Sequence, residues 1–456
     1  MSMPPGPRAP ALVQTIWWMA QPVERLDAAF REYGALYTRK NLLFGDEVII
    51  SDPRIVKEVL TGDPEVFHAA DVNTAAEPLV GTKSVLLLDK TRHQRMRRLM
   101  NPPLHGERMQ LYAQTMIDVT GAAIDAWPEG TPFSLQPHMM RITLEFIMRT
   151  VFGLEEGANM NELGDGLTRL LDQALTPVGI MLMYPALQRN LGPLTPWAGF
   201  VRARERVDAM IYALIARRRA GEGAGGTDML TMLLEAVDED GGSMDDQELR
   251  DQLVTLLSAG HETTATALSW VIAELLGNPD ALERTLAELD AVTGGGPPRR
   301  EDLGRLEYLD AVIKEALRVR PISPLVVRRL RAPVQLGGYD LPAGVMVVPC
   351  PYLVQRHPDY WPEPARFMPE RFLGKKLDPY AWFPFGAGAR RCIGMAFALF
   401  EMKVVLATML TRVRLEIAEP LPLKVALRAF MFAPKGGTRV RVTRRTAGAS
   451  RRAAAA

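Results

Sequence analysis

Cys392 stands in the run of residues with the clearest chemical meaning in this sequence. It is one of only two cysteines, and an apolar helical run from Met395 to Leu410 begins directly after it. A cysteine at the start of a helix meets unpaired backbone N–H groups and the positive end of the helix dipole, which favour the thiolate over the thiol. A thiolate is a strongly donating axial ligand for haem iron. These residues therefore predict that Cys392 holds a haem iron.

The residues around this cysteine suit the same chemistry. Gly386, Gly388 and Gly394 carry no side chains at positions where the backbone would approach a flat macrocycle. Phe385 can shield the sulfur from water, and Arg390 can neutralise a haem propionate. The alternative is a buried structural cysteine beside a glycine-rich turn. The spacing Phe-x-x-Gly-x-Arg-x-Cys-x-Gly arises by chance in fewer than roughly one in ten thousand chains of this length, which favours the iron ligand.

The longest helical segment carries a face of small side chains near its middle. It runs from Ser243, the expected N-cap, to Leu276, which is about nine turns, so it would cross the whole domain. The residues that share this face are Leu256, Ala259, Gly260, Thr263 and Ala267. Glycine inside a helix costs about 1 kcal/mol relative to alanine, which indicates that another group comes close at Gly260. We expect this face to form a groove over the iron.

Two polar residues at this groove can handle oxygen and protons. Thr263 can hydrogen-bond dioxygen and hold a water molecule, while Glu262 can relay protons inward from solvent. The simpler alternative is that Thr263 and Thr264 are helix residues without a chemical role. The place of this segment ahead of the cysteine motif favours the catalytic interpretation. His261 lies off the groove by helical spacing, so we do not expect it to be a ligand.

Glu315 and Arg318 stand three residues apart on another predicted helix, where they can pair on one face, although most such pairs are solvated. With the two motifs above, they resemble the cytochrome P450 family, whose haem-binding loop is matched at every fixed position. In that family the Glu–Arg pair is buried and joined by a second arginine, for which Arg371 stands at the matching place. The resemblance assigns these three residues to folding and support of the haem pocket.

The resemblance covers nearly the whole chain and implies that the cofactor is haem b. It places Ala259 and Gly260 against the haem. His93 and Arg97 resemble helix residues that reach a haem propionate, and Arg328 resembles the propionate arginine on a later strand. Taken alone, each of these basic residues would be interpreted as a solvated surface group.

The same resemblance places a substrate pocket among apolar segments. Its expected lining residues are Val80, Leu87, Ile180, Leu256, Ala259, Leu325, Val326, Phe430 and Met431. An apolar lining predicts a lipophilic substrate such as a fatty acid, terpenoid, steroid or polyketide. The motifs around Thr263 and Arg371 look most like fatty-acid hydroxylases. The strand at Val48 to Ile50 has no arginine to clamp a carboxylate, however, although Arg39 and Lys40 are nearby.

The activity implied by the resemblance is that of a haem-thiolate monooxygenase, which hydroxylates or epoxidises its substrate with one atom of O2. We find no flavin- or nicotinamide-binding motif, so we expect no fused reductase and an external ferredoxin or flavodoxin-type donor with its own reductase. A basic docking surface for this donor could comprise Lys90, Arg92, Arg95, Arg98, Arg391 and Lys403. A peroxide-driven peroxygenase and a haem-binding sensor or carrier are the alternatives. Glu262 and Thr263 count against both.

The composition of the 456 residues is that of a globular enzyme, with 47% hydrophobic and 23% charged residues. A net charge of +1 argues against a nucleic-acid partner. Two cysteines are too few for a disulfide framework and fit a reducing compartment, so we expect a cytoplasmic protein. The run from Ala11 to Ala20 is about half as long as a bilayer requires. We therefore expect no transmembrane segment. We also expect the protein to be a monomer.

The periodicity predicts a mainly helical chain with a small β-rich region. Helices are expected at 104–127, 135–151, 160–175, 198–219, 243–276, 280–292, 303–319 and 393–413, and strands at 35–38, 47–51, 334–336 and 345–348. We expect one catalytic domain over residues 1–456, with flexible tails at about 1–10 and 444–456. The resemblance places the haem between the long helix and the cysteine loop with its following helix. Cys350 is expected to be a packing residue.

Overall fold

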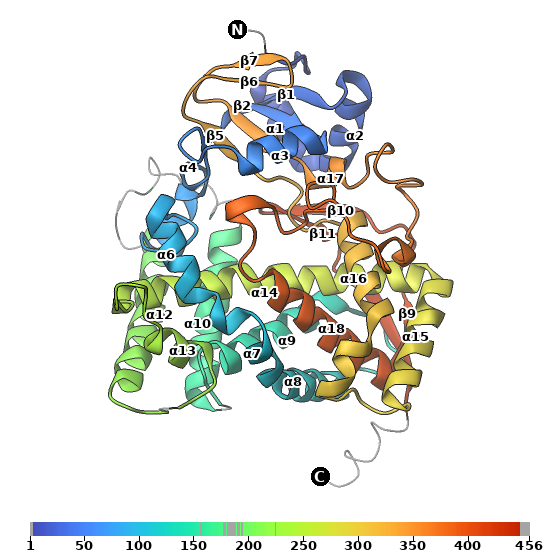
Figure 1. Ribbon diagram of the computed structural model, residues 1–456. Helices are drawn as coiled ribbons and strands as arrows, with labels where there is room; N and C mark the ends of the chain where they lie inside the picture. The colour runs from blue at the N-terminus through green and yellow to red at the C-terminus, as the bar shows by residue number, and fades with distance from the viewer. Residues whose placement is uncertain are drawn as a thin grey trace.

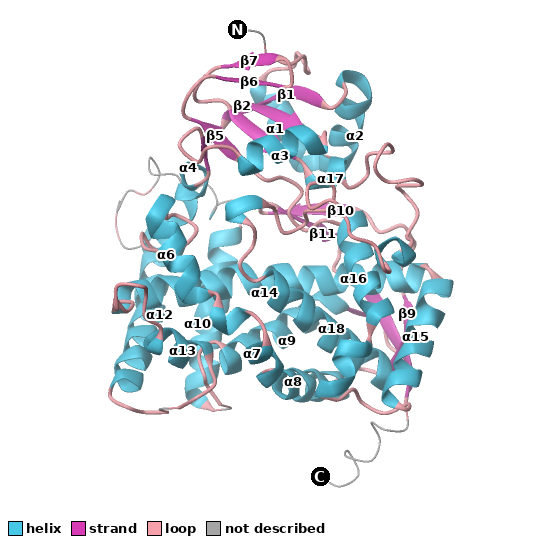
Figure 2. Ribbon diagram, viewed as in Figure 1, coloured by secondary structure: helices cyan, strands magenta, loops and turns pink. Residues whose placement is uncertain are grey.

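The computed structural model describes residues 3–155, 157–176, 195–223 and 225–446, with 179, 188 and 192 as single described positions. Figure 1 shows a helical body, with the strands nearest the N-terminus gathered at the end from which the N-terminus leaves. In Figure 2 these strands, in magenta, lie above the cyan helices, and a smaller pair lies between the two parts. The fold is mainly helical with a small β-rich region, as the sequence predicts.

The helices follow the predicted periodicity along most of the chain. Their bounds are α1 Ala11–Ala20, α2 Pro22–Tyr33, α3 Pro53–Thr61, α4 Ala70–Asn73, α5 Glu77–Val80, α6 Lys90–Met100, α7 Glu107–Leu111, α8 Ala113–Asp125, α9 Leu135–Thr150, α10 Ala158–Leu175, α12 Pro196–Arg219, α13 Met229–Glu235, α14 Asp246–Gly277, α15 Pro279–Thr293, α16 Glu307–Val319, α17 Pro351–Val354 and α18 Met395–Arg412. The predicted helix at 104–127 is interrupted at Tyr112, where α7 ends and α8 begins.

The strands form four small sheets. Their bounds are β1 Leu36–Asn41, β2 Gly45–Ile50, β3 Phe67–His68, β4 Phe133–Ser134, β5 Arg328–Leu330, β6 Val334–Leu336, β7 Tyr339–Leu341, β8 Met346–Pro349, β9 Val413–Ile417, β10 Val425–Arg428, β11 Met431–Pro434 and β12 Arg439–Arg445. The largest sheet has the order β1-β2-β8-β5-β3, in which β2 and β8 are parallel. Strands β6 and β7 form a hairpin around Gly337 and Gly338, two glycines with positive φ.

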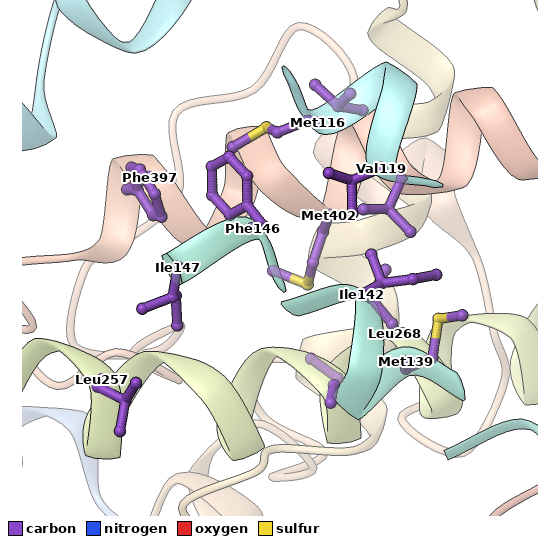
Figure 3. Close-up of a cluster of buried hydrophobic side chains, with 14 of the residues drawn as sticks. Met116, Val119, Met139, Ile142, Phe146, Ile147, Leu257, Leu268, Phe397 and Met402 are labelled. Carbon is purple, nitrogen blue, oxygen red and sulfur yellow. The ribbon is translucent and has the colours of Figure 1, made fainter. Parts of the chain in front are cut away.

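The main hydrophobic core lies where α8, α9, α14 and α18 meet. Figure 3 shows side chains of these four helices pointing toward one another, among them Met116, Ile142, Phe146, Leu268 and Met402. Each of these five is buried, and burying one such side chain contributes about 1.5–3 kcal/mol. The ring of Phe146 also stacks on the ring of Phe397 with centroids 5.5 Å apart. This packing holds α14 and α18 in a fixed relation, so it positions both parts of the site.

Helix α14 begins two residues later than the sequence predicts. Its N-cap is Asp245, whose carboxylate accepts from the N–H of Glu248 at 2.8 Å, while Glu248 accepts from the N–H of Asp245 at 3.1 Å. This reciprocal capping box satisfies two helix-end donors. Ser243 instead forms an isolated bridge with Val237. The predicted N-cap was therefore wrong, because an aspartate with a glutamate three residues later caps better than the serine upstream.

The terminal segments contact the folded chain more than was expected. The carbonyl of Pro5 accepts from the N–H of Thr38 at 2.9 Å, and that of Pro4 accepts from the Thr38 hydroxyl at 2.7 Å. At the other end, Arg444 and Arg445 belong to β12 and pair with β9. The tails expected at 1–10 and 444–456 are thus held to the sheets at these positions. Among the described residues, no helix is long and apolar enough to span a bilayer.

Candidate functional site

The loop that carries Cys392 is closed by backbone hydrogen bonds. The N–H of Cys392 donates to the carbonyl of Phe385 at 2.8 Å, and a short 3-10 turn, Gly388–Arg390, lies between them. The N–H of Gly394 donates to the cysteine sulfur, and α18 starts at the next residue. Phe385 is half-buried and packs against the core. The loop therefore presents the sulfur from the N-terminal end of a helix, as the sequence predicts.

The glycines of the cysteine loop differ in backbone conformation and in what a Cβ atom would contact. Gly388 has a φ of +68°, and a Cβ there would lie 2.1 Å from the carbonyl oxygen of Leu60 on α3. Gly386 also has a φ of +68°, but a Cβ there would meet no atom within 4 Å. A Cβ on Gly394 would meet only the sulfur of Cys392 at 4.0 Å. Contact with another helix thus accounts for Gly388, and the expected approach of this loop to a macrocycle stays a prediction.

Opposing effects act on the pKa of the Cys392 thiol. Its surface is accessible, yet many protein atoms surround the sulfur, so burial raises the pKa of the thiol. The N–H of Gly394 and the charges of Arg97 and Arg391 lower that pKa, but burial is the larger effect. The helix end and burial therefore act on the pKa of this thiol in opposite directions. A metal cation that binds a thiol deprotonates it outright.

Four basic side chains from distant parts of the chain lie within electrostatic reach of one another. His93 is buried on α6, and its pKa is lowered to about 4 by burial and then by Arg390, Arg97 and Arg328. Burial, and then Arg390, lowers the pKa of Arg328 to about 10, so this guanidinium stays charged at neutral pH. Its NH1 group donates to the carbonyl of Val327 at 2.8 Å. Within the described residues no carboxylate lies within ion-pair distance of Arg328.

Arg390 has a partner that the sequence did not reveal. Its guanidinium forms an ion pair with Asp89 and donates to the backbone carbonyl of Val85 at 3.4 Å. Asp89 also lies 2.8 Å from Nε2 of His68. The charge of Arg390 is thus partly neutralised inside the protein, which weakens its expected pairing with a haem propionate. The ion pair joins the cysteine loop to the start of α6.

The small-residue face is the most accessible part of the middle of α14. Ala259 is exposed, whereas Leu256, Gly260 and Thr263 are half-buried and Ala267 is buried. The hydroxyl of Thr263 donates to the carbonyl of Ala259 at 2.6 Å. A Cβ on Gly260 would meet only the side chain of Ile147, at an ordinary 3.6 Å. Packing within the protein therefore does not demand glycine at this position.

Glu262 points away from this face and into an ion pair. Its side chain is 4% exposed and contacts the guanidinium of Arg428 from β10. Burial raises the pKa of Glu262, and Arg428 opposes that rise. His261 is buried as well, with Nδ1 2.9 Å from the hydroxyl of Thr143, and burial lowers its pKa to about 4. Sequence reasoning missed Arg428, because nothing in the local pattern of a short strand indicates a partner on α14.

The Glu315 motif forms a buried network. Glu315 and Arg318 are fully buried on α16 and contact through both carboxylate oxygens at 2.6 and 2.8 Å. Arg371 brings a second guanidinium to 3.4 Å from the same carboxylate, which also accepts from the N–H of Met368 at 2.8 Å. Arg318 donates further to backbone carbonyls, such as that of Gln355 at 2.8 Å. The structure thus brings all three predicted residues together and ties α16 to the proline-rich path of residues 337–385, which precedes the cysteine loop.

The comparisons with known proteins agree with this arrangement. Residues 4–438 match the family described as cytochrome P450. The chain is 41% identical over 443 residues to the putative cytochrome P450 135B1 of Mycobacterium tuberculosis and Mycobacterium bovis, covering 97% of this chain and 92% of the relative. This chain belongs to the cytochrome P450 family. It is therefore a haem-containing monooxygenase that uses O2, a substrate and a redox partner.

Other cytochromes P450 are similar over the same length. The putative cytochrome P450 138 of Mycobacterium tuberculosis is 36% identical over 445 residues, which is 97% of both chains. Among solved structures, the cytochrome P450DA haem domain is 25% identical with a TM-score of 0.86, covering 98% of each chain. A retinoic acid-bound cyanobacterial CYP120A1 is 24% identical with a TM-score of 0.83, covering 98% of this chain and all of the other, and supports the fold alone.

The residues of the site fit the haem that a cytochrome P450 carries. An accessible cysteine sulfur can supply the axial ligand. The basic cluster contains Arg328, which is 8% exposed and lacks a carboxylate partner in the described part of the chain, and Arg97, which lies near the sulfur. Two propionate carboxylates would supply negative charge that this cluster is short of. His93, Arg97, Arg328 and Cys392 are the residues that would hold the group.

The expected substrate residues of this cytochrome P450 differ in accessibility. Val80 and Met431 are buried in the core, Leu87, Leu256, Leu325 and Val326 are half-buried, and Ala259 and Phe430 are exposed. Ile180 lies outside the described residues. Six of the nine thus have accessible apolar surface, and Leu256 and Ala259 share it with Thr263 on one helix face.

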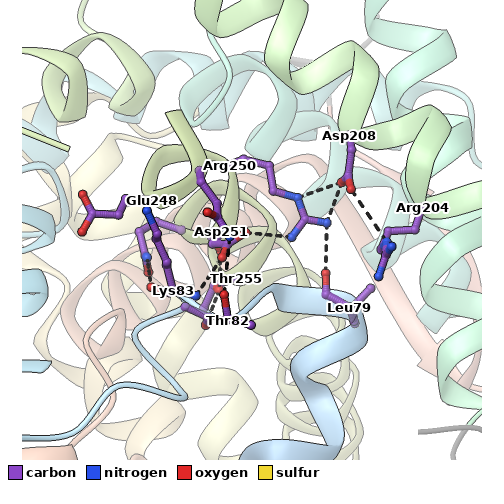
Figure 4. Close-up of polar contacts among 12 residues, drawn as sticks. Leu79, Thr82, Lys83, Arg204, Asp208, Glu248, Arg250, Asp251 and Thr255 are labelled. Atoms are coloured by element: carbon purple, nitrogen blue, oxygen red, sulfur yellow. Dashed lines mark hydrogen bonds and ion pairs between the residues drawn. The ribbon is translucent and has the colours of Figure 1, made fainter. Parts of the chain in front are cut away.

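The segment after Val80 is attached to the N-terminal half of α14 by polar contacts (Figure 4). The N–H of Lys83 donates to the carboxylate of Asp251 at 2.9 Å, and Arg250 donates to the carbonyl of Leu79 at 3.3 Å. Gly81 has a φ of +83°, and a Cβ there would lie 2.1 Å from Asp251. Sequence reasoning missed these contacts, for which a glycine at a turn was the only local signal. They hold this wall of the expected pocket to the catalytic helix.

The basic residues expected to bind an electron donor are not equally available. Lys90 pairs with Glu65, Arg95 with Asp238 and Glu248, Arg98 with Glu239, and Lys403 with Asp310. Arg92 and Arg391 are exposed, and neither has an ion-pair partner within the described residues. The proposed docking surface therefore narrows to these two arginines, because the charges of the other four are engaged by carboxylates of the same chain.

Proposed function

We propose that this cytochrome P450 inserts one oxygen atom of O2 into a C–H bond or double bond of a lipophilic substrate, with electrons from a separate ferredoxin or flavodoxin-type protein and its reductase. The observation that carries the proposal is a buried carboxyl at Glu262 on the residue before Thr263, whose hydroxyl lies on the accessible face of α14. The hydroxyl shares its helix face with Leu256 and Ala259. A proton donor beside apolar surface suits oxygen chemistry on a nonpolar ligand.

Some residues of the chain are expected to bind the haem, and others are expected to transfer protons. When bound, the haem supplies oxygen activation, because electron donation from a thiolate ligand favours O–O cleavage. Cys392 would provide the thiolate, and His93, Arg97 and Arg328 would hold the propionates. Thr263 donates its own proton to the carbonyl of Ala259, so its oxygen lone pairs are free to accept from a water. That water is placed to carry protons that enter through Glu262.

The site also bears on the two alternative functions that the sequence left open. A peroxide-driven peroxygenase of the same fold would not need an acid and a threonine on α14, and a haem-binding sensor or carrier would need neither. A buried carboxyl that is paired with Arg428 and stands one residue before Thr263 is better suited to a reaction that consumes protons. This feature favours the O2-dependent reaction over both rivals.

The decisive experiment uses the purified haem protein with a surrogate ferredoxin, its reductase, NADPH and isotopically labelled O2. We expect NADPH consumption that depends on substrate, and a product that carries one labelled oxygen atom. Product formation with peroxide alone, and none with the reductase system, would contradict the O2-dependent reaction. Stable ligand binding without any product under either condition would contradict an enzymatic role.

The substrate class is tested by ligand-induced shifts of the haem Soret band. Fatty acids, terpenoids, steroids and polyketides form the panel, with hydrophilic sugars as negative controls. We expect at least one lipophilic class to shift the band. Ala259→Phe fills the open face of α14 and should abolish the shift while the reduced carbon monoxide spectrum is retained. A shift that persists in this variant would place the ligand elsewhere.

A further inference from the structure

The carboxyl of Glu262 has one ion-pair partner in the described part of the chain, and that partner comes from a distant hairpin. Arg428 is the last residue of β10, and it pairs across the turn with Met431 of β11. The Arg428 side chain is 41% exposed, whereas that of Glu262 is 4% exposed. The ion pair therefore connects a buried carboxyl on the catalytic helix with a group that reaches solvent.

The hairpin that carries Arg428 is fixed to the same helix. The carbonyl of Phe432 accepts from the indole N–H of Trp270 at 2.9 Å, and the N–H of Phe432 donates to the carbonyl of Ile322 at 2.8 Å. Trp270 lies on α14 about two turns beyond Glu262. Strand β11 is thus anchored to α14, and this anchor fixes where β10 can place the Arg428 guanidinium.

Few charges among the described residues face Glu262. Arg428 is the nearest opposite charge, and Asp172 on α10 is a carboxylate whose like charge raises the pKa of Glu262. His261 is neutral at pH 7, because burial and Arg428 lower its pKa to about 4. Without Arg428 the carboxyl would be a buried acid beside a like charge, and it would stay protonated to higher pH. A relay group that keeps its proton cannot easily accept the next one.

We propose that Arg428 is a positioning residue for the Glu262 carboxyl, which it holds at the solvent end of the proton path and whose working pH range it sets. The proposal rests on the proton-relay role given to Glu262 above. A proton from water binds the carboxylate and opens the ion pair. When that proton passes to the water at Thr263, the carboxylate is restored and pairs with Arg428 again, while the guanidinium keeps its own proton throughout.

The pair itself is tested by thermal unfolding of the haem protein. The variants are Arg428→Gln, Glu262→Gln and the double variant, with Arg441→Gln as the matched control. Arg441 is also a strand arginine paired with a carboxylate, and its side chain is 43% exposed. We expect Arg428→Gln to lower the melting temperature in the parent but to have little further effect on Glu262→Gln. Equal effects in both backgrounds would overturn the proposed pairing.

The role in proton delivery is tested by the pH profile of the fraction of electrons lost to peroxide, measured with a surrogate ferredoxin, its reductase and a ligand that shifts the Soret band. Loss of an opposite charge beside a carboxyl shifts its titration by about one pH unit or more. We therefore expect the alkaline limit of coupled turnover to move up by about one unit in Arg428→Gln. Arg428→Lys should restore most of the parent profile, and Arg441→Gln should match it.

The outcomes separate this inference from the proposed function. A parent protein that turns over O2, with an Arg428→Gln profile superimposed on its own, would overturn the role of Arg428 alone. A parent protein without O2-dependent turnover would contradict the proposed function, and the melting-temperature comparison would still decide whether Arg428 positions Glu262. A matching Soret spectrum in each variant shows that the haem site is intact, so that a shifted profile supports the inference.

Discussion

Thr263 and Glu262 are consecutive residues whose side chains leave α14 about 100° apart. The hydroxyl of Thr263 lies over the open face and donates to the carbonyl of Ala259, whereas Glu262 turns toward Arg428. The two neighbouring side chains therefore have different surroundings. Thr263 lies on the face expected to meet the ligand, and Glu262 lies toward Arg428, which reaches solvent. This geometry would let a buried carboxyl at Glu262 supply protons without occupying the groove.

Replacing Thr263 by alanine removes the hydroxyl from the groove. We expect Thr263→Ala to lower the rate of product formation by about a hundredfold, the usual contribution of one proton-transfer group, and to divert electrons to peroxide. The measurement is product and peroxide per NADPH consumed. Thr263→Ser keeps the hydroxyl and serves as the control. Unchanged coupling in the alanine variant would show that Thr263 is only a helix residue.

The two cysteines offer a matched pair of variants. Cys392→Ser should abolish the thiolate-type spectrum of the reduced carbon monoxide adduct, because a serine oxygen does not replace a thiolate as a donor. Cys350→Ala is the control, since Cys350 is fully buried between β8 and α17 and burial raises the pKa of its thiol to about 12. We expect that control to keep the spectrum. Loss of the spectrum in both variants would point to unfolding instead of ligand loss.

At the scale of the elements, the Glu315 network joins α16 to the proline-rich path that leads to the cysteine loop. Its three charged residues come from two segments, and each guanidinium also contacts backbone carbonyls. A buried ion pair of this kind gives little net stability. It fixes one arrangement of the two segments, because loss of either partner leaves a buried charge without a counterion. The cation–π contact of Arg318 with Trp361, at 5.2 Å, adds to the same constraint.

The network predicts a large loss of stability from a single substitution. Arg371→Met leaves Glu315 with one guanidinium fewer, and we expect the free energy of unfolding to fall by about 3 kcal/mol. Urea denaturation of the haem protein measures this change. Arg366→Met is the control, because Arg366 pairs with Glu363 at the surface and its side chain is 65% exposed. Such a surface pair contributes about 0–1 kcal/mol, so similar losses in both variants would contradict a special role for Arg371.

At the scale of the whole molecule, the core holds a buried acid, Glu401, that has no ion-pair partner in the described part of the chain. Glu401 on α18 is 2% exposed, and its Oε1 atom has no hydrogen-bond partner among the described residues. Burial raises the pKa of this carboxyl well above its ordinary value. The folded protein therefore binds a proton here that the unfolded chain releases at a lower pH.

This buried acid predicts how global stability depends on pH. A raised pKa in the folded state gives stability that is complete below the unfolded-state pKa, about 4.3, and is lost as pH rises through the folded-state pKa. We expect Glu401→Gln to remove this loss, which amounts to about 1.4 kcal/mol per pH unit over the affected range. Urea denaturation between pH 5 and pH 8 measures the slope. Glu416→Gln, an exposed control, should keep the parent slope, and an unchanged slope in Glu401→Gln would contradict the prediction.

The sequence predicted the elements that local physics controls. Helices α9, α12, α15 and α18 begin and end within two residues of their expected bounds, because apolar periodicity and proline positions act within a few residues. The N-cap of α14 was misplaced for an equally local reason, since two candidate caps compete there. The residues of the cysteine loop and the Glu315 motif could be named from spacing and family resemblance.

Only the tertiary structure decided which charges meet. Arg428 forms an ion pair with Glu262, and Asp89 partly neutralises the charge of Arg390. The carbonyl oxygen of Leu60 leaves no room for a Cβ atom at Gly388. Each of these partners lies far away in the sequence. Such pairs depend on how sheets and helices pack, and no local pattern encodes them. The sequence alone therefore determined that Cys392 offers a sulfur ligand at a helix start. The packing of α14, β10 and α6 around that sulfur decided which groups surround the acid and the basic cluster.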